Sequence, residues 1–150
     1  MDSESSWDSV IDGVGFIEAS QVDVVKRDRP TCDPKKLYLD SCATHSSMFA
    51  TEFLDKRHRT GVTLRQNCNA GSRLTNRMGF WSVWKFWENE DGIANLLSEP
   101  EIVKQGYEVT IMQGKRTVFS PDRKTKWMFK KDNGVCDGMA FLDMTKMEEH

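Results

Sequence analysis

Short apolar or β-branched runs, separated by turn-forming residues, recur along the chain from residue 35 onward, and this pattern restricts the possible folds most strongly. The runs are too short for helices of ordinary length. Gly, Pro, Asn and Asp lie between them, as they do between strands. The runs cover residues 37–39, 61–64, 80–87, 93–97, 107–112, 116–120, 126–130 and 139–143. The sequence therefore predicts a mainly β domain.

One short helix is predicted with clear boundaries. Ser98 stands three residues before Glu101, which is the spacing of a capping box, and Pro100 suits the first turn. Gly106 readily adopts the left-handed conformation that ends many helices. We expect a helix of about two turns between Ser98 and Gly106.

The N-terminal part of the chain differs in composition from the rest. Residues 1–9 are acidic and rich in serine, which is typical of disordered segments. Residues 20–25 have the β-branched content of one short strand. With 38% hydrophobic and 29% charged residues among 150, the chain is slightly poor in apolar residues for one compact domain. We therefore divide it into a flexible acidic arm (1–34), a domain (35–143) and a C-terminal tail (144–150).

Charge, hydropathy and cysteine content argue against several classes of protein. The formal net charge of −2 does not suit the basic surface of a nucleic-acid-binding domain. No apolar run approaches the ~20 residues that span a bilayer, and the acidic N-terminal sequence is unlike a secretory signal. The cysteines are widely and unevenly spaced, unlike a disulfide framework. We expect an intracellular, cytoplasmic protein with reduced thiols and neither a membrane nor a nucleic acid as partner.

Residues 37–46 include the side chains most suited to catalysis. Asp40 and Ser41 directly follow an apolar run, so a buried strand would place the carboxylate at its end. We expect the following main-chain amides and the Ser41 hydroxyl to hydrogen-bond this carboxylate. Two carboxylates about 3 Å apart share one proton: the ionised one activates water and the protonated one polarises a carbonyl. The chain's other Asp-Ser pairs lie in the polar arm, so such a pair of carboxylates requires a twofold homodimer.

Three separated blocks occur in a characteristic order. They are Asp40-Ser41-Cys42-Ala43-Thr44-His45, then Asn95-Leu96-Leu97-Ser98 and, after the predicted helix, Gly106-Tyr107-Glu108-Val109. From about residue 37 to 143 the chain resembles the protease segment of copia-type retrotransposon polyproteins, a branch of the retropepsin-like aspartic proteases. It is most similar to versions from algal and diatom elements. Residues 131–138 resemble the run that leads toward the next polyprotein module.

The resemblance implies a fold, an activity and a partner. The fold would be retropepsin-like, a small closed β-barrel or sandwich with one short helix and a flap hairpin. The protein would be an aspartic endopeptidase that acts as a homodimer and processes its own Gag-Pol-type polyprotein inside the cell, including within virus-like particles. No metal ion and no organic cofactor is implied.

The resemblance also assigns residues to the active-site loop. Asp40 would be the catalytic carboxylate, and Ser41 would brace it. Cys42, Ala43 and Thr44 would continue the loop beside the substrate. The chain departs from the family pattern at Cys42, where the family usually has glycine.

The polar, glycine-bearing segment 67–71 has the composition of a hairpin tip. In the family the flap hairpin is expected here. Asn69, Ala70 and Gly71 would then close over an extended peptide that pairs as an added strand.

Other interpretations of these residues stay open. Asp40 could simply end a strand in a turn. Cys42 and His45 have the Cys-x-x-His spacing of a metal half-site, which Cys32 and Cys68 would complete. The same two residues could form a thiol nucleophile if another group oriented the imidazole. The alternative function is a degenerate, non-catalytic protease-like domain that serves interaction or assembly.

The aromatic and basic clusters also have structural interpretations. Residues 80–87 include tryptophans at 81, 84 and 87, which suit one strand buried on both faces or a subunit contact. Tryptophan side chains can also stack on single-stranded bases. We expect the basic residues at 56–59 and 123–126 to lie in solvated turns.

Overall fold

The computed structural model describes residues 10–14, 31–68, 71–133, 136 and 138–146 of the chain. The elements are β1 (Val10–Val14), β2 (Lys36–Asp40), β3 (Ser47–Met48), the 3-10 helix η3 (Thr51–Phe53), β4 (Asp55–Cys68), β5 (Gly71–Trp81), β6 (Trp84–Glu88), β7 (Asn95–Ser98), α2 (Glu99–Lys104), β8 (Glu108–Met112), β9 (Lys115–Phe119), β10 (Lys126–Lys131) and β11 (Ala140–Asp143). The part of the chain that is described is therefore mainly β with one short α-helix, which confirms the predicted class. No helix in it is long and apolar enough to cross a membrane.

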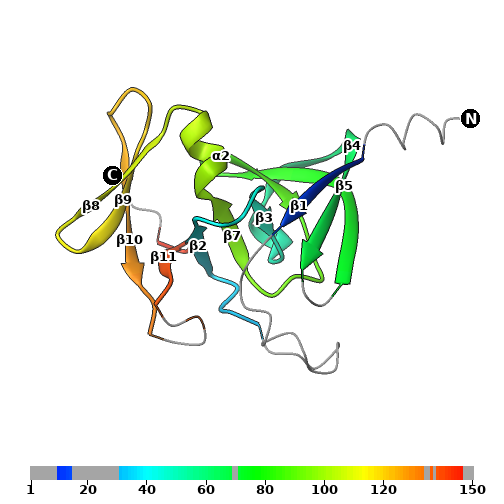
Figure 1. The fold of residues 1–150 in the computed structure, drawn as a ribbon, viewed down its shortest axis with the longest axis horizontal. Helices are drawn as coiled ribbons and strands as arrows, with labels where there is room; N and C mark the ends of the chain where they lie inside the picture. The colour runs from blue at the N-terminus through cyan, green and yellow to red at the C-terminus, as the bar shows by residue number, and fades with distance from the viewer. Residues whose placement is uncertain (1–9, 15–30, 69–70, 134–135, 137, 147–150) are drawn as a thin grey trace, which may run out of the picture.

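The strands form one mixed sheet in the order β1-β4-β5-β6-β3-β7-β2-β11-β10-β9-β8. Figure 1 shows β8, β9 and β10 at one end of the molecule and the long β4–β5 hairpin at the other, with β2, β7 and β3 between them. The centre of the sheet therefore brings together strands that are far apart in the sequence.

The parallel strands β2 and β7 are buried on both faces. Asp40 lies opposite Ser98 at their carboxyl ends. Leu39 and Leu97 belong to the larger hydrophobic core, whereas Tyr38 belongs to a smaller core because successive side chains of a strand point to opposite faces. Continuous apolar runs are expected for such doubly covered parallel strands.

The sheet is open, so the predicted closed barrel is wrong. Within the described residues β1 pairs with β4 and β8 pairs with β9, and these two outer strands do not pair with each other. Closure of a barrel requires its first and last strands to pair. The outer strands β1 and β8, which would have to meet, lie far apart in Figure 1, with β2 and β7 between them.

The hairpin predicted around residues 67–71 is confirmed, although it is longer than expected. Cys68 pairs with Gly71 at the end of the β4–β5 ladder, and the tip itself, residues 69–70, lies outside the described residues. The predicted strand 61–64 is only the middle of β4.

One of the two basic clusters lies in a strand. Residues 56–59 are part of β4 and not of a turn, because irregularities in the β4–β5 register let the strand continue through them. Lys56 itself has a left-handed φ of 52°. Of the other cluster, residues 123–125 do lie in the turn before β10, as expected, whereas Lys126 begins the strand.

Residues 80–87 were predicted as one strand, but they belong to two: β5 ends at Trp81 and β6 begins at Trp84. Trp81 pairs with Trp84 across a turn, and Ser82 within that turn has a φ of 57°. All three tryptophans of this segment are buried. The Trp84 and Trp127 ring centroids lie 4.6 Å apart. These tryptophans are core residues, which confirms the predicted burial.

Part of the predicted N-terminal arm contacts the domain. β1 pairs in parallel with β4, with Val10 opposite Thr63, and the sequence did not predict this strand. The backbone N–H of Cys32 donates a 2.8 Å hydrogen bond to the carbonyl of Ile93. The segment predicted to be disordered (1–9) and the strand predicted at 20–25 lie outside the described residues.

A disulfide joins Cys32 to Cys136, so the prediction of reduced thiols is wrong for these two residues. They are 104 positions apart in the sequence, and their Cα atoms are separated by 6.3 Å. Both are buried in the smaller core, which also contains Ala43 from the loop after β2. Spacing along the chain did not reveal the pair because only the tertiary fold brings the two segments together.

Reduction of this disulfide is expected to lower the free energy of unfolding by about 2–4 kcal/mol, since a cross-link over a long loop restricts the unfolded chain. Urea denaturation with and without dithiothreitol measures the loss. A Cys42→Ser variant is the matched control, because Cys42 is an exposed free thiol, and it should show the same loss as the wild type. Equal urea denaturation midpoints with and without dithiothreitol would contradict a stabilising role of the disulfide.

Candidate active site

Asp40 is a buried carboxylate at the end of β2. The residue is 5% exposed. Its Oδ1 accepts a 2.8 Å hydrogen bond from the backbone N–H of Cys42, as expected for an amide that follows the aspartate. Its Oδ2 is buried without a hydrogen-bond partner among the described residues. Burial of a polar atom without a partner is costly, so this oxygen marks a position where another polar group is expected to bind.

The residues after Asp40 form an exposed loop whose base is anchored in the core. Ser41 and Cys42 are exposed, whereas Ala43 is buried. The Ser41 hydroxyl lies 3.9 Å from the Cys42 sulfur, so within one chain it contacts its neighbour and not the Asp40 carboxylate. Cys42 is not among the described non-glycine residues with positive φ. The loop therefore forms without the backbone conformations that only glycine adopts easily.

Ser98 and Ser46 connect this loop to the start of α2. The Ser98 hydroxyl donates to the carbonyl of Ala43 at 2.7 Å and accepts from the backbone N–H of Glu101 at 3.1 Å. The backbone N–H of Ser98 donates to the Ser46 hydroxyl at 2.8 Å. The predicted helix cap is thus confirmed, and the same hydroxyl also holds the loop.

Glu101 departs from the reciprocal capping box that its spacing predicts. Its Oε1 accepts a 2.9 Å hydrogen bond from the backbone N–H of Ser46, so its carboxylate contacts the loop instead of completing the box at Ser98. Local spacing could not predict this, because Ser46 lies 55 positions away. Ser46 and Glu101 are site-positioning residues that the sequence analysis missed.

Asn95 is the other positioning residue that was missed. It is fully buried, and its Oδ1 accepts hydrogen bonds from the backbone N–H groups of Phe49 (3.0 Å) and Ala50 (3.1 Å). Its Nδ2 donates to the carbonyls of Pro34 (2.9 Å) and Lys36 (3.0 Å). One side chain therefore joins the segments on both sides of the Asp40 loop. In the sequence, its place in the block Asn95-Leu96-Leu97-Ser98 was the signal that could have indicated this positioning role.

The structure brings some of the predicted site residues together and leaves others outside its description. Asp40, Ser41, Cys42 and Ala43 form one loop, and exposed Thr44 continues it. Gly71 begins β5. Asn69 and Ala70 lie outside the described residues, so their predicted contact with substrate stays a prediction.

The metal-site alternative loses one of its four ligands, since Cys32 is in the disulfide. Among the described residues, no three or more His, Cys, Asp and Glu side chains gather in a way that could hold a metal ion. The ring of His45 has its Nδ1 3.2 Å from the Thr44 hydroxyl, which gives no support to a Cys42–His45 nucleophile pair.

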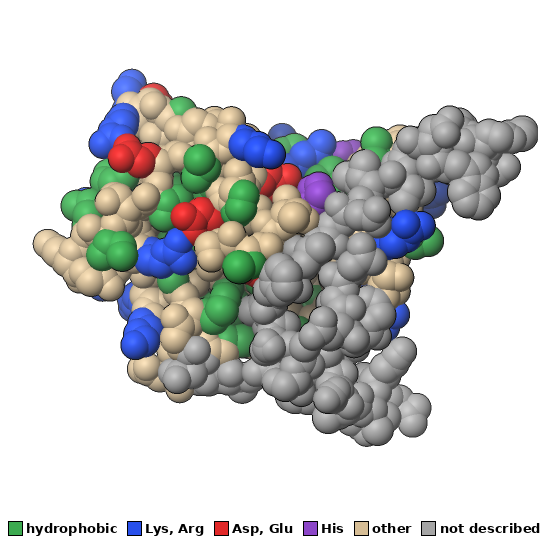
Figure 2. Space-filling model, viewed as in Figure 1, with side chains coloured by type: hydrophobic (Ala, Val, Ile, Leu, Met, Phe, Trp, Pro, Cys, Tyr) green, Lys and Arg blue, Asp and Glu red, His purple; other side chains and the backbone are tan. Residues whose placement is uncertain are grey.

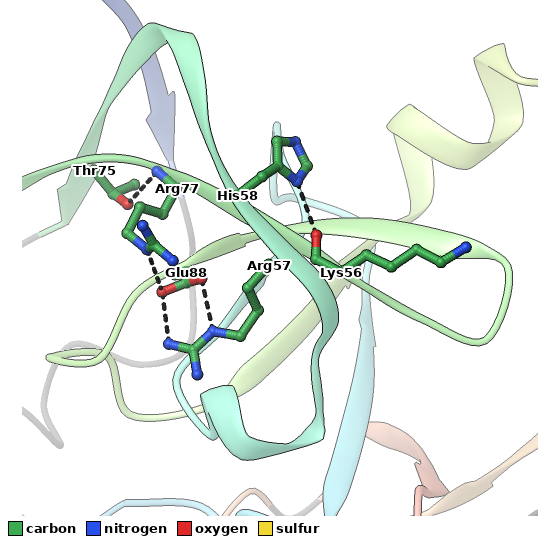
Figure 3. Close-up of polar contacts among 6 residues, drawn as sticks. All are labelled: Lys56, Arg57, His58, Thr75, Arg77 and Glu88. Atoms are coloured by element: carbon green, nitrogen blue, oxygen red, sulfur yellow. Dashed lines mark hydrogen bonds and ion pairs between the residues drawn. The ribbon is translucent and has the colours of Figure 1, made fainter.

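An ion-pair cluster joins the strands at the base of the hairpin, and Figure 3 shows two arginines converging on Glu88. Arg57 of β4 donates from Nε to Oε2 (2.9 Å) and from Nη2 to Oε1 (3.0 Å). The Nε of Arg77 in β5 lies 3.5 Å from Oε1. The hydrogen bonds from Arg57 hold the pKa of Glu88 below its usual value of 4.5, and the arginine charges add to this effect while burial opposes it.

A Glu88→Gln variant is expected to lose about 1–3 kcal/mol of unfolding free energy at pH 7. Because the pKa of Glu88 is lowered on folding, its stabilising effect is complete above 4.5 and disappears as the pH falls through the folded-state value. The denaturation midpoints of the wild type and the Glu88→Gln variant, measured from pH 7 to pH 3, should therefore approach each other as the pH falls below about 4.5. A difference that stayed constant over this range would contradict the ion pair as its source.

No protein-family model, curated protein or solved structure was found to match this chain. The assignment of a function therefore depends on the residues and the geometry described above.

Proposed function

We propose that this chain is a retropepsin-like aspartic endopeptidase that processes a retroelement polyprotein as a homodimer. Each protomer contributes Asp40, and the two carboxylates meet across a twofold axis and share one proton. The ionised carboxylate takes a proton from water as the water attacks the scissile carbonyl, and the protonated one hydrogen-bonds the carbonyl oxygen. The carbon–nitrogen bond then breaks as the leaving nitrogen receives a proton.

One observation carries the proposal: the Oδ2 of Asp40 is buried and has no hydrogen-bond partner in the part of the chain that the structure describes, and it lies beside the exposed residues Ser41 and Cys42. A partner protomer that docks on this loop supplies the missing group, namely the second carboxyl with the shared proton. Ser41 braces the active-site loops only in the dimer, where its hydroxyl faces the loop of the other chain.

The surrounding contacts support a loop of defined geometry. Asn95, Ser98 and Glu101 hold the chain on both sides of Asp40 through hydrogen bonds of 2.7 to 3.1 Å. Precise placement of reacting groups is a large part of catalysis. The substrate is an extended polypeptide, which the β4–β5 hairpin covers and pairs with as an added strand.

Two measurements test the proposal. Sedimentation velocity of the purified chain should show a dimer, since a monomer has half of the proposed site. A longer precursor that contains this chain should cut itself at mildly acid pH, at a rate that rises with protein concentration while the dimer is incompletely formed. A strict monomer contradicts the proposal, and a folded dimer that leaves the precursor intact favours the non-catalytic interaction domain.

A further inference from the structure

The outer edge of the β4–β5 hairpin is occupied by β1. The two strands run parallel, with Ile11 opposite Leu64. On its other side the same stretch of β4 pairs with β5, where Leu64 lies opposite Thr75. Within the described residues β1 is the last strand at this end of the sheet, and Figure 1 shows it alongside the hairpin. Residues 64–67 of β4 therefore have a strand on each side.

This pairing is the kind of contact that the proposed substrate needs. An extended peptide binds to a sheet through the main-chain N–H and C=O groups along one strand edge. Each edge pairs with one neighbouring strand, so β1 and an incoming peptide cannot pair with the same residues of β4 at once. The edge itself is competent for peptide binding, because it already holds a parallel segment of five residues.

The part of β4 opposite β1 is covered although it lies outside the two hydrophobic cores. Leu64 is fully buried but is not a member of either core. Gln66, on the same face of the strand, is 7% exposed, and its Oε1 is buried with no hydrogen-bond partner in the described part of the chain. Such an acceptor is expected where another polar group binds. This stretch of the hairpin is therefore suited to contact with another segment.

Charge favours β1 as the occupant of this edge. Asp12 is the only charged residue of β1, and in the register it lies opposite Arg65. Opposite charges at facing positions of neighbouring strands are favourable. Apart from Asp55, the charged residues of β4 and β5 are all basic, namely Lys56, Arg57, Arg59, Arg65, Arg73 and Arg77. Figure 2 shows Lys and Arg side chains on the side of the molecule where the hairpin lies. An acidic segment therefore suits this edge better than a basic one.

β1 also has the advantage of belonging to the same chain. Cys32, which follows β1 in the arm, is held by its disulfide to Cys136 and by the 2.8 Å hydrogen bond from its N–H to the carbonyl of Ile93. A tethered segment acts at an effective concentration on the order of millimolar, whereas a free peptide pays the whole cost of association. A weakly binding β1 therefore still competes with a free peptide.

We propose that β1 is a built-in competitor, which holds the edge of β4 and must leave before another extended peptide can pair there. Competition for the edge is independent of any activity, whereas its effect on cleavage rests on the proposed function. In the protease, the chain with β1 in place is self-inhibited, and release of β1 activates it.

A variant with two prolines removes β1 from the edge. In the full chain, Ile11→Pro together with Asp12→Pro removes one N–H from each of the two alternating sets of β1 amides, so the pairing fails whichever set donates to β4. Ser5→Pro together with Ser6→Pro, ahead of β1, is the matched control. For binding measurements the parent chain and both variants carry Asp40→Asn, which prevents self-cleavage, and their denaturation midpoints show whether folding is kept.

Binding is measured by NMR titration of each full chain with acetylated Val-Ile-Asp-Gly-Val amide. We expect saturable amide shifts at residues 63–67 of the double-proline variant, and at least about five-fold weaker binding to the parent and control chains, whose edge β1 holds. The peptide Val-Pro-Pro-Gly-Val, which lacks the N–H groups for pairing, should give no saturable shifts. Equal binding of the first peptide to all three chains, or its failure to bind any of them, overturns the proposal.

A charge change tests the same contact without proline. Asp12→Lys places like charges at facing positions with Arg65 and should tighten the apparent binding of the free peptide by about two- to five-fold, because β1 holds the edge less firmly. Asp8→Lys, ahead of β1, is the matched control and should change this binding less than two-fold. Equal effects of the two substitutions overturn the assigned pairing of β1.

Precursor cleavage separates this proposal from the proposed function. With Asp40 restored, the double-proline variant should cut its precursor at least about five-fold faster than the wild type at equal protein concentration, and the free Val-Ile-Asp-Gly-Val peptide should slow it. Equal cleavage rates of the two chains overturn self-inhibition. An uncut precursor in every chain, with the competition still seen by NMR, contradicts the protease function and upholds the competition for β4.

Discussion

Replacement of Asp40 by Asn is expected to slow self-cleavage of a precursor by about 10²–10⁴-fold, the usual contribution of a general acid or base. The amide cannot take a proton from water, yet it keeps the shape of the side chain and can still accept the hydrogen bond from Cys42 that Oδ1 accepts at 2.8 Å. The variant should therefore remain folded and dimeric. Time courses of precursor cleavage at mildly acid pH, with sedimentation of the same samples, measure both properties.

Two controls separate catalysis from structure. Asp91→Asn removes an exposed aspartate whose ion pair with Arg73 is of the surface kind that adds little stability, so cleavage should be unchanged. In mixtures of wild-type and Asp40→Asn chains, activity should follow the square of the wild-type fraction, because each active dimer needs two copies of Asp40. If the wild type and the Asp40→Asn variant cut the precursor at equal rates, Asp40 has no catalytic role.

Replacement of Asn95 by Ala is expected to lower the free energy of unfolding by about 3–5 kcal/mol. The change removes four hydrogen bonds to backbone groups, and it leaves those donors and acceptors buried or partly buried without a partner. Such unsatisfied groups cost more than the hydrogen bonds themselves contribute. Chemical denaturation at pH 7 measures the loss.

Asn133→Ala is the matched control, because Asn133 is exposed and its replacement should alter stability by less than about 0.5 kcal/mol. The Asn95 variant should also lose precursor cleavage, since it loosens the segments on both sides of Asp40. Wild-type stability of the Asn95 variant would contradict its role as the connection between these segments.

Much of the secondary structure follows from local sequence. The strands at β8, β9, β10 and β11 lie within a residue or two of the predicted runs, because alternating apolar residues and turn residues act over short distances. The helix start at Ser98 and the left-handed Gly106, with a φ of 100°, were predicted for the same reason.

One error was local, and the others occurred where contacts between distant segments decide the result. Residues 80–87 contain enough aromatic side chains for one buried strand, but the chain turns at Ser82 so that Trp81 and Trp84 face each other. The Cys32–Cys136 disulfide and the bond from Ser46 to Glu101 join residues that no local pattern connects. The open sheet likewise depends on where its outer strands lie in space.

The sequence by itself determined the mainly β class, the helix capped by Ser98 and the position of Asp40 at the end of an apolar strand, because these depend on side-chain period and neighbouring residues. Only the tertiary structure decided that β2 and β7 lie side by side and that Asn95 holds the loop from both sides. It also decided that one oxygen of Asp40 is buried with no hydrogen-bond partner among the residues described. Burial and hydrogen-bond satisfaction are properties of the packed chain, since they depend on which distant groups exclude water from each atom.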